Sequence, residues 1–411
     1  MICSRLEAGK QLRHDYFVSE LTRLQKNALQ QREGQSETVK YKVFAGTWNV
    51  GGLASPDDLD LKDFLDIETD YCDIYVIGFQ EIVPLNARSV LGPKRRSAAM
   101  KWDSLIGDAL NNRGRRRQHA MAAGCRQGNG RRQWLREEET FRCVMSKQMV
   151  GILVSVWVRS ALRRHLRHTA ASRVGAGVLR RLGNKGAVSV RFLLHDTSFC
   201  FVCCHLASGG ADGDALRRNA DAADILSRTL FSGGGDGPAQ EELPRKILDH
   251  DRVVLLGDLN YRIAMGAAEA RQLVRARKWS MLLENDELLL ELSKGRRFDG
   301  WREGLVTFAP TYKYHRNSDK FYWCASDGAD NGDNHKQHRA PAWCDRILWR
   351  GKGMRQARYE RCGGYRLSDH RPVRAVFHIV CEAEEGVDSE KVKQADILCS
   401  EMVYTRGNET L

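Results

Sequence analysis

Val253-Val254-Leu255-Leu256-Gly257-Asp258-Leu259-Asn260-Tyr261-Arg262 is the stretch that organises the rest of the chain. Its four leading apolar residues predict a short strand that is buried on both faces. Because side chains alternate along an extended chain, Asp258 and Asn260 are expected to point the same way. An acid beside an amide at a strand end suits a site that aligns a water and holds an anionic oxygen. An Asx turn that ends the strand has the same pattern.

Two earlier strands end in polar side chains in a similar manner. Residues 41–48 predict a strand that runs into Asn49 and a Gly-Gly turn, and residues 73–79 predict a buried strand that ends near Glu81. A carboxylate directly after a core strand needs a cation, a water or another partner. Ligands of α/β sheets gather beyond the strand ends, so Asn49, Glu81 and the Asp258 stretch predict one shared site. For Asn49 alone, turn chemistry is the alternative.

Two histidines extend this set of polar side chains. His205 lies near the end of a strand predicted for residues 199–206, and Asp369-His370 precede a strand predicted for residues 373–379. A histidine can transfer protons or hold a charge near neutral pH. A lone histidine at a strand end is more often structural, so His205 has both interpretations.

A short turn between two glycines, Gly183-Asn184-Lys185-Gly186, precedes another predicted strand. The glycines predict a tight turn that leaves the Lys185 ammonium exposed. Such an ammonium suits a phosphate clamp, and the same pattern suits an ordinary hairpin. A helix is predicted further along, over residues 212–231, with its apolar side formed by Leu216, Ala220, Ala223 and Leu230.

The composition favours a large intracellular α/β protein with anionic partners. The chain has 411 residues, 42% of them hydrophobic, and a formal net charge of +13, which favours phosphates, anionic lipid surfaces or nucleic acid. The 12 cysteines are scattered and no signal peptide is recognised, so we expect a reducing compartment. Cys200 and Cys203 form a CxxC pattern, but they face opposite sides of a strand, which argues against a metal or redox role. No apolar run approaches the ~20 residues that a membrane span needs.

Residues 94–140 differ from the rest in being rich in basic side chains. A helix is predicted over residues 98–110, and a long basic loop beyond it. The loop is either a tolerated surface insertion, an anchor to anionic lipid or nucleic acid, or a nuclear import signal. The basic residues are Lys94, Arg95, Arg96, Arg113, Arg115, Arg116, Arg117, Arg126, Arg131, Arg132 and Arg136.

The order of these elements is more specific than any one of them. It follows the layout of the metal-dependent exonuclease/endonuclease/phosphatase superfamily. Four longer motifs resemble the signatures of inositol polyphosphate 5-phosphatases, and the short chain is most similar to the plant type I enzymes. These motifs are Gly46-Thr47-Trp48-Asn49, Gly257-Asp258-Leu259-Asn260-Tyr261-Arg262, Pro341-Ala342-Trp343-Cys344-Asp345-Arg346-Ile347-Leu348 and Ser368-Asp369-His370-Arg371-Pro372-Val373.

The resemblance implies an α/β fold, a four-layer α/β/β/α sandwich in which two mixed sheets pack face to face with helices outside. It implies a catalytic domain over residues 39–380, with a basic insertion at about 94–140. Residues 1–38 are then an N-terminal extension, helical or disordered, and residues 381–411 a C-terminal tail.

The resemblance also implies a Mg²⁺-dependent phosphomonoesterase. Its substrate is expected to be a phosphoinositide such as phosphatidylinositol 4,5-bisphosphate, a soluble inositol polyphosphate, or both. Because Mg²⁺ prefers oxygen ligands and keeps several waters, Glu81 as main ligand and Asn49 as carbonyl ligand suffice. Asp258 is expected to orient and deprotonate the attacking water, and Asn260 to donate to the phosphoryl oxygens.

The two histidines and one acid complete the implied catalytic set. His205 and His370 are expected to contact the transferring phosphate, with Asp369 holding an imidazole in its useful tautomer or assisting the metal. The pairing of histidines with acids is left open by the sequence. Arg346 is expected to be a structural brace near the site.

The substrate-binding side chains follow from the resemblance as well. Tyr312, Lys313 and Arg339 match positions that contact the 4-phosphate, while Asn184 and Lys185 match a loop that reaches the 1-phosphate side. The chain departs from the family two residues before Arg339, where the family often has a lysine and this chain has glutamine. The preference for a 4-phosphate is therefore left open.

Two alternatives belong to other functional classes. One is an endonuclease of the same superfamily, which the basic loops permit and the inositol-type motifs disfavour. The other is a catalytically silent module that binds anionic membranes. We expect a monomer without a stable nucleic-acid partner, located in the cytoplasm, with peripheral contact at the inner face of the plasma membrane or a nuclear fraction.

Overall fold

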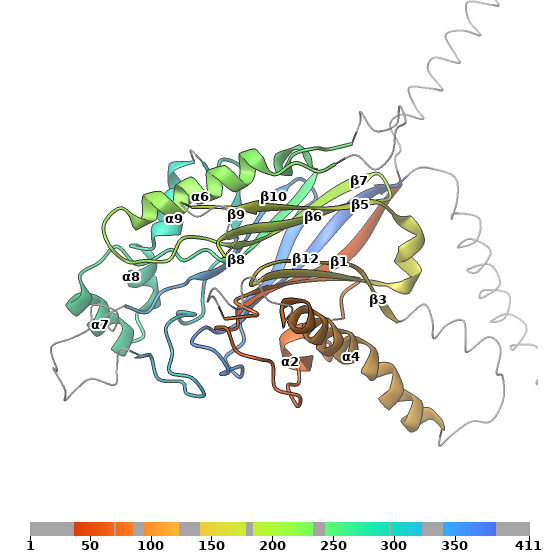
Figure 1. The fold of residues 1–411 in the computed structure, drawn as a ribbon, viewed down its shortest axis with the longest axis horizontal. Helices are drawn as coiled ribbons and strands as arrows, with labels where there is room; N and C mark the ends of the chain where they lie inside the picture. Colours follow the sequence, from red (N-terminus) through yellow and green to blue (C-terminus); the bar gives the residue numbers. More distant parts are fainter. Residues whose placement is uncertain are drawn as a thin grey trace, which may run out of the picture. The chain divides into compact units, whose positions relative to one another are not determined.

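Two mixed six-stranded sheets form the centre of the computed structural model (Figure 1). The chain divides into two compact units, Lys40–Val380 and a second one made of Met1–Val39 and Cys381–Leu411. Most of the second unit, including the leading helix predicted before residue 37, lies outside the described residues. The structure describes residues 37–69, 71–84, 94–122, 140–177, 184–232, 243–295, 297–322 and 340–383.

The first sheet has the strand order β11-β12-β1-β2-β4-β3. Strands β1 and β2 are parallel, whereas the β2–β4, β3–β4 and β11–β12 pairs are antiparallel. Every residue of β2 is buried, as its continuous apolar sequence predicts. The strands are β1 (Glu37–Asn49), β2 (Ile74–Gln80), β3 (Phe141–Met149), β4 (Ile152–Arg159), β11 (Met354–Arg361) and β12 (Val373–Ala383).

The second sheet has the strand order β5-β6-β7-β8-β10-β9. Strands β7 and β8 run parallel in its centre, and the other neighbours are antiparallel. The strand that the apolar run before Asp258 predicts is β8, and all of its residues are buried. The strands are β5 (Leu166–Gly175), β6 (Gly186–Leu194), β7 (Thr197–His205), β8 (Arg252–Asp258), β9 (Arg302–Glu303) and β10 (Asp345–Gly351).

The two sheets approach each other closely at Gly78. A Cβ at this position would lie 2.7 Å from the Cys203 sulfur and 2.9 Å from a Leu256 methyl group, so any larger residue would clash with side chains of the second sheet. Cys203 faces the first sheet and contacts the Gln80 amide nitrogen at 3.3 Å, whereas Cys200 packs on the opposite side among the apolar residues of the outer layer. The prediction that these two cysteines face opposite sides is confirmed.

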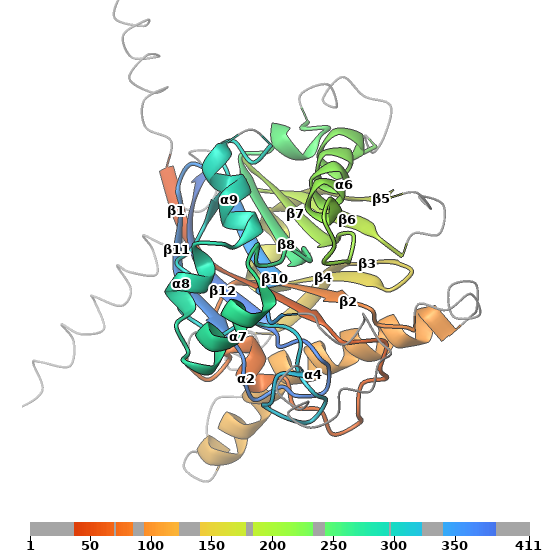
Figure 2. The same cartoon turned by 90° about the vertical axis from the view of Figure 1, so that its left-hand side faces the viewer.

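Helices cover the outer faces of both sheets, which gives the predicted four layers (Figures 1 and 2). On the first sheet, Trp102 of α4 packs on Phe79 of β2 with ring centroids 4.4 Å apart. On the second sheet, Ile225 of α6 and Leu288 of α9 join the apolar cluster of β7 and β8. The helices are α2 (Lys62–Leu65), α4 (Lys94–Ala122), α6 (Asp214–Arg228), α7 (Ala267–Arg275), α8 (Trp279–Leu283) and α9 (Glu287–Lys294), with 3-10 turns at Ser160–His165 and Ile247–Asp249.

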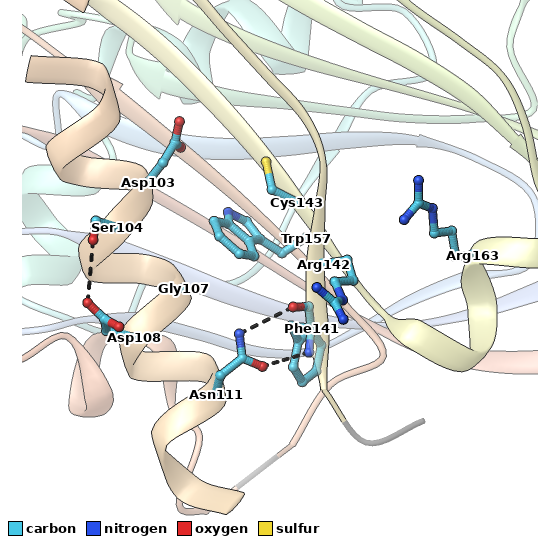
Figure 3. A pocket seen from close by; sticks show the side chains of 10 residues that line it. All are labelled: Asp103, Ser104, Gly107, Asp108, Asn111, Phe141, Arg142, Cys143, Trp157 and Arg163. Atoms are coloured by element: carbon cyan, nitrogen blue, oxygen red, sulfur yellow. Dashed lines mark hydrogen bonds between the residues drawn. The ribbon is translucent and has the colours of Figure 1, made fainter. Parts of the chain in front are cut away.

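Helix α4 is longer than the sequence predicts and replaces the first part of the expected basic loop. It covers Lys94–Ala122, and residues 123–139 lie outside the described residues. Asn111 fastens it to the sheet, because its side chain accepts from the Phe141 backbone N–H at 2.8 Å and donates to the Phe141 carbonyl at 3.2 Å (Figure 3). A surface cavity of about 580 Å³ lies beside this contact and is lined by none of the predicted site residues. No helix in the described ranges is long and apolar enough to cross a membrane.

The strands that the sequence misses are edge strands. Strands β3, β5 and β11 each end a sheet, and their sequences carry arginines and other polar residues in place of an apolar run. An edge strand faces solvent on one side, so it lacks the hydrophobic pattern of a central strand. Strand β3 ends at Met149, the chain turns at Val150-Gly151, and the apolar run that follows forms β4.

The buried side of helix α6 differs from the one that its apolar residues predict. Leu216 and Leu230 are 68% and 54% exposed, whereas Arg218, Asn219 and Asp221 are buried. These polar side chains form hydrogen bonds with backbone and side-chain groups of the loops that follow β7 and β8. The free energy of these hydrogen bonds outweighs what burying a few methyl groups would contribute.

Candidate active site

The strand register brings the predicted side chains to one end of the sheets. In the second sheet, His205 at the end of β7 pairs with Asp258 at the end of β8, and Asp258 pairs in turn with Asp345 at the start of β10. In the first sheet, Asn49 pairs with the last residue of β2, directly before Glu81. The side chains therefore meet because parallel strands end together.

The backbone around Asp258 is tightly constrained. Gly257 has φ +149°, and a Cβ there would lie 2.0 Å from the Cys204 carbonyl oxygen, so only glycine fits. Two non-glycine residues of the site, Glu81 and Asn260, have φ of +56° and +58°. Left-handed backbone costs on the order of 1 kcal/mol or more for such residues and concentrates at functional sites.

Asp258 lies at the centre of the site and is 1% exposed. Its Oδ2 accepts from Asn49 Nδ2 at 2.9 Å and lies 3.3 Å from His205 Nε2 and 3.9 Å from His370 Nε2. Burial alone would raise the pKa of Asp258, but the His370 and His205 imidazoles and the Lys185 ammonium outweigh it and hold the pKa below its ordinary range. The Asp258 carboxylate is therefore charged at neutral pH.

His370 is oriented by Asp345, a residue to which the sequence assigns no role. Its Nδ1 donates to Asp345 Oδ2 at 2.9 Å, and both side chains are buried. The alternative partner predicted from the sequence, Asp369, instead accepts a hydrogen bond from the Ser368 hydroxyl at 3.2 Å. Burial lowers the pKa of His370, but Asp345 and Asp258 outweigh this and raise it to about 9. The ring is therefore an imidazolium at neutral pH.

The raised pKa of His370 predicts a loss of stability at high pH. The folded protein keeps the imidazole protonated up to about pH 9, whereas an unfolded chain releases this proton near pH 6.5. The stabilisation is therefore complete below pH 6.5 and is lost as pH rises through 9. By urea titration, we expect the stability difference between the wild type and His370→Asn to fall by about 1–3 kcal/mol over this range.

A control and a contradicting result accompany this pH experiment. His378→Asn changes a histidine of β12 outside the site and is the matched control variant. A constant difference between the wild type and His370→Asn from pH 6.5 to 9 would show that the folded protein does not hold this imidazole as a cation.

Lys185 enters the site, in contrast to the exposed ammonium that its turn predicts. Its Nζ contacts His205 Nε2, and the residue is only half-exposed. Burial lowers the pKa of Lys185, while Asp258 and Glu81 partly oppose that effect. Burial and the nearby Lys185 charge also lower the pKa of His205. Asn184, the other predicted residue of this turn, is half-buried beside Lys185.

Asn260 is held at both ends of its side-chain amide. Nδ2 donates to the Leu206 carbonyl at 3.1 Å, and Oδ1 accepts from Arg262 at 2.7 Å. Its backbone N–H also donates to Asp258 Oδ1 at 3.1 Å. Arg262 lies in the motif of residues 257–262. Its other contacts are with residues distant in the sequence, so the motif alone does not predict them.

Glu81 has the properties of a cation ligand. Its side chain is 27% exposed, in contrast to 2% for Asp258, so an ion that keeps part of its water shell has room beside it. Its Oε1 lies 3.3 Å from Asn49 Nδ2 and 3.7 Å from His205 Nε2. The oxygen donor and its partial exposure therefore fit a divalent ion of the Mg²⁺ type.

The Asn49 side chain directs its nitrogen toward the carboxylates, and not the oxygen that is predicted to bind the metal. Its Oδ1 accepts from the Gly51 backbone N–H at 2.9 Å, which directs its nitrogen to Glu81 and Asp258. In this orientation Asn49 is a hydrogen-bond donor to the carboxylates. A ligand role for its carbonyl requires the amide to rotate and to lose the Gly51 contact.

A second group, Asp258, Asp345 and His370, also offers ligand atoms within 4.8 Å of one another. All three residues are buried, and the His370 imidazolium is already paired with Asp345 and lies 3.9 Å from Asp258. A metal cation bound to this group would have to displace the positive charge of His370. This argument favours Glu81 as the first ligand.

The predicted substrate contacts lie beside the catalytic group. The Tyr312 ring packs on His370 with centroids 4.5 Å apart, and the Arg262 guanidinium lies 4.7 Å from the centre of the same ring. The Lys313 ammonium lies 4.6 Å from the Tyr322 ring centre. Arg339 and the departure at Gln337 lie outside the described residues.

Arg346 is a buried brace, as predicted. Its guanidinium is fully buried and pairs with Asp286 at 2.9 Å and with Glu303 at 2.5 Å. Asp286 also caps helix α9 through the Leu289 N–H, and Glu303 accepts from the Tyr359 hydroxyl. The brace therefore joins β9, β10, β11 and α9 behind the site.

Known proteins share this fold and these motifs. The model of endonuclease/exonuclease/phosphatase family 2 matches residues 46–376. Type IV inositol polyphosphate 5-phosphatase 9 of Arabidopsis thaliana is 51% identical, over 82% of this chain and 78% of that protein. Type I inositol polyphosphate 5-phosphatase 8 of the same plant is 45% identical, over 82% and 70%. Both types thus occur among the relatives.

A solved structure matches over almost the whole chain. It is the inositol polyphosphate 5-phosphatase domain of SPsynaptojanin, in complex with inositol (1,4)-bisphosphate and a calcium ion. The TM-score is 0.67 at 29% identity, over 94% of this chain and 97% of that domain. A related domain therefore binds an inositol phosphate and a divalent ion, in keeping with the candidate cation ligands found above. From its motifs, its fold and these relatives, the chain belongs to the inositol polyphosphate 5-phosphatase family of the endonuclease/exonuclease/phosphatase superfamily.

Proposed function

We propose that this protein is a Mg²⁺-dependent phosphomonoesterase that removes the 5-phosphate from an inositol ring. The substrates would be phosphoinositides such as phosphatidylinositol 4,5-bisphosphate, soluble inositol polyphosphates, or both. The observation that carries the proposal is the convergence of Glu81, His205, Asp258, Asn260 and His370 from separate segments. The ligand in the related domain, inositol (1,4)-bisphosphate, is also what remains when inositol 1,4,5-trisphosphate loses its 5-phosphate.

The first task of the site is to orient a water against the phosphorus. The Asp258 carboxylate accepts a hydrogen bond from that water, and its low pKa makes it a better orienting group than resting-state base. As the water oxygen bonds to phosphorus, its acidity rises sharply and its proton passes to the Asp258 carboxylate. The bond between phosphorus and the inositol 5-oxygen breaks in the same step, and that oxygen leaves as a hydroxyl after it takes a proton from solvent. Asn49, which donates to Asp258 at 2.9 Å, holds the carboxylate in place.

The second task is to offset negative charge on the phosphoryl oxygens. The His370 imidazolium and the Lys185 ammonium supply positive charge, and Asn260 supplies an amide N–H. Such donors fixed before the reaction stabilise the transition state without reorganisation. Mg²⁺ bound at Glu81 would add positive charge beside the phosphate oxygens.

Changing Glu81 to glutamine should weaken cation binding more than folding. The variant keeps the shape and loses the negative charge that attracts a divalent ion. By isothermal titration with Mg²⁺, we expect the apparent Kd to rise by about tenfold or more, and kcat to fall by roughly 10²-fold. Glu284→Gln, at the exposed residue that directly follows α8, is the matched control. An unchanged Mg²⁺ affinity would move the cation to the Asp258–Asp345–His370 group.

A substrate panel tests the proposed activity. Phosphate release is measured with Mg²⁺ on lipid and soluble inositol phosphates, with and without the 5-phosphate and the 4-phosphate. We expect release only from substrates that carry a 5-phosphate. Release that does not depend on the 5-phosphate would refute the proposal.

Two further assays separate the alternatives and address the location. Nicking of a plasmid or of an abasic duplex would support an endonuclease. Binding to anionic liposomes without phosphate release would support a silent membrane-binding module. A monomer in the cytoplasm with peripheral membrane contact is part of the proposal, supported by the net charge of +13.

A further inference from the structure

We propose that Arg262, Glu287 and Arg218 are positioning residues that fix the direction of the Asn260 amide. They would act through Asn260 without touching the transferring phosphate. The proposal rests on the proposed function, because Asn260 donates there to a phosphoryl oxygen. It assigns a positioning purpose to Arg218 of α6 and Glu287 of α9, two charged side chains outside the catalytic centre.

The Asn260 side chain works only in one of two orientations. An amide has an oxygen end that accepts and a nitrogen end that donates, and only the nitrogen end stabilises an anionic oxygen. Asn260 is 3% exposed, and its Nδ2 donates to the Leu206 carbonyl at 3.1 Å. The nitrogen carries two hydrogens, so one N–H is left for the substrate.

Arg262 decides between the two orientations. Its Nη2 donates to Asn260 Oδ1 at 2.7 Å, the shortest hydrogen bond that is described for this amide. A guanidinium has five donors and no acceptor. If the amide rotated, its NH₂ group would face that donor and its oxygen would face the Leu206 carbonyl. Both contacts would become repulsive, so the amide nitrogen stays directed to the site.

Arg262 is itself held from three sides. Its Nε donates to the Gly209 carbonyl at 3.2 Å, and its guanidinium lies over the Tyr312 ring. Its backbone N–H donates to Glu287 Oε2 at 2.8 Å. The arginine is 7% exposed, so little solvent competes for these bonds.

Glu287 and Arg218 close the network. Arg218 Nη2 donates to the same Glu287 oxygen at 2.7 Å, and its Nη1 donates to the Gly209 carbonyl at 3.2 Å. The Gly209 carbonyl and Glu287 therefore each bind both arginines. This joins α6 and α9 to the loops after β7 and β8, which carry His205 and Asn260.

The energetics favour positioning over stability as the purpose of this network. Arg218 is fully buried, and burying charges costs several kcal/mol, which their attraction only partly returns. Apolar residues would fill the same space at lower cost. Charged side chains make directional hydrogen bonds, which methyl groups cannot make. The Asn260 amide needs such bonds to stay in one orientation.

A double-mutant cycle on soluble inositol 1,4,5-trisphosphate tests the proposal. The variants are Arg262→Met, Asn260→Ala and the two combined, with Mg²⁺ present throughout. We expect Arg262→Met to lower kcat by about 10²-fold with KM within about threefold, because an oriented donor is lost while binding groups remain. The combined variant should match Asn260→Ala within about threefold, because no amide is left to orient.

A second variant covers the case in which Arg262→Met does not fold. Glu287→Gln keeps the shape of the side chain, and we expect kcat to fall by about tenfold in the wild type and not at all beside Asn260→Ala. Glu291→Gln, one turn further along the same helix where the acid pairs with Lys294, is the matched control and should leave kcat unchanged. Circular dichroism and thermal unfolding establish that each variant is folded.

Two results would overturn the proposal, and they differ from each other. If Arg262→Met or Glu287→Gln lowers kcat by the same factor with and without Asn260, the residues do not act through its amide, and this proposal fails alone. If the wild type releases no phosphate from this substrate, the proposed function fails, and this proposal fails with it.

Discussion

Replacing Asp258 with asparagine should lower kcat for 5-phosphate release by roughly 10²- to 10⁴-fold, the range typical for loss of a general base or of its orienting role. The side chain keeps its size but loses its negative charge. The water then loses a charged acceptor, and His370 and His205 lose the carboxylate that lies 3.9 Å and 3.3 Å from their Nε2 atoms. KM should change much less, because Asp258 carries the same charge as the phosphate.

The control for this experiment separates chemistry from folding. Asp224→Asn changes an acid on the surface of α6, whose contact with Arg228 is solvent-exposed, and should retain full activity. The Asp258→Asn protein should keep the far-ultraviolet circular dichroism of the wild type. Equal phosphate release by Asp258→Asn and Asp224→Asn would remove Asp258 from the mechanism.

Replacing Arg346 with methionine should lower the free energy of unfolding by about 3–5 kcal/mol, because it leaves two buried acids without a partner. Asp286 and Glu303 both pair with this guanidinium, and their side chains are 0% and 2% exposed. Urea titration of the wild type and the variant gives the difference directly. Arg217→Met is the matched control, because this arginine is 75% exposed and Asp214 keeps its bond from the Ala211 N–H, so the change should cost less than about 1 kcal/mol.

A third variant identifies the cause of the loss. When Asp286→Asn and Glu303→Gln are added to Arg346→Met, the orphaned charges are removed, and we expect a substantial part of the lost stability to return. If neutralising the two acids gives no recovery, the loss comes from packing and not from unpaired charge.

The central strands and the strand-end residues follow from local patterns. The apolar runs of β2 and β8 are buried along their whole length, and the residue types at their ends are those that bind water and ions. Edge strands such as β5 carry solvent-facing polar residues, so no apolar run marks them. The position of α4 on the sheet depends on contacts such as the Asn111–Phe141 bridge, which a local pattern does not contain.

The pairing within the site depends on long-range register. His370 and Asp345 are 25 residues apart, and Tyr312 brings their segments together because it pairs with both Ala342 and His370. The neighbouring acid, Asp369, is adjacent in sequence and is not the hydrogen-bond partner of the ring. Lys185 turns inward for a similar reason, because β6 and β7 pair Gly186 with His205 and carry the lysine to the site.

Helix α6 shows a general limit of hydrophobic patterns. Leu216 is exposed and Arg218 is buried, because the helix packs on loops whose backbone carbonyls need donors. A pattern of apolar residues reports the face that avoids water, whereas this helix is oriented by hydrogen bonds. The buried face of this helix is linked to Asn260 through the hydrogen bonds of Glu287 and Arg262.

The most direct test of the account is the position from which phosphate is lost. Inositol 1,4,5-trisphosphate is incubated with the wild-type protein and Mg²⁺, and the product is identified by phosphorus NMR. We expect one equivalent of phosphate and inositol 1,4-bisphosphate, with neither product from the Asp258→Asn protein. Loss of the 1-phosphate or the 4-phosphate, or an intact substrate after prolonged incubation, would contradict it.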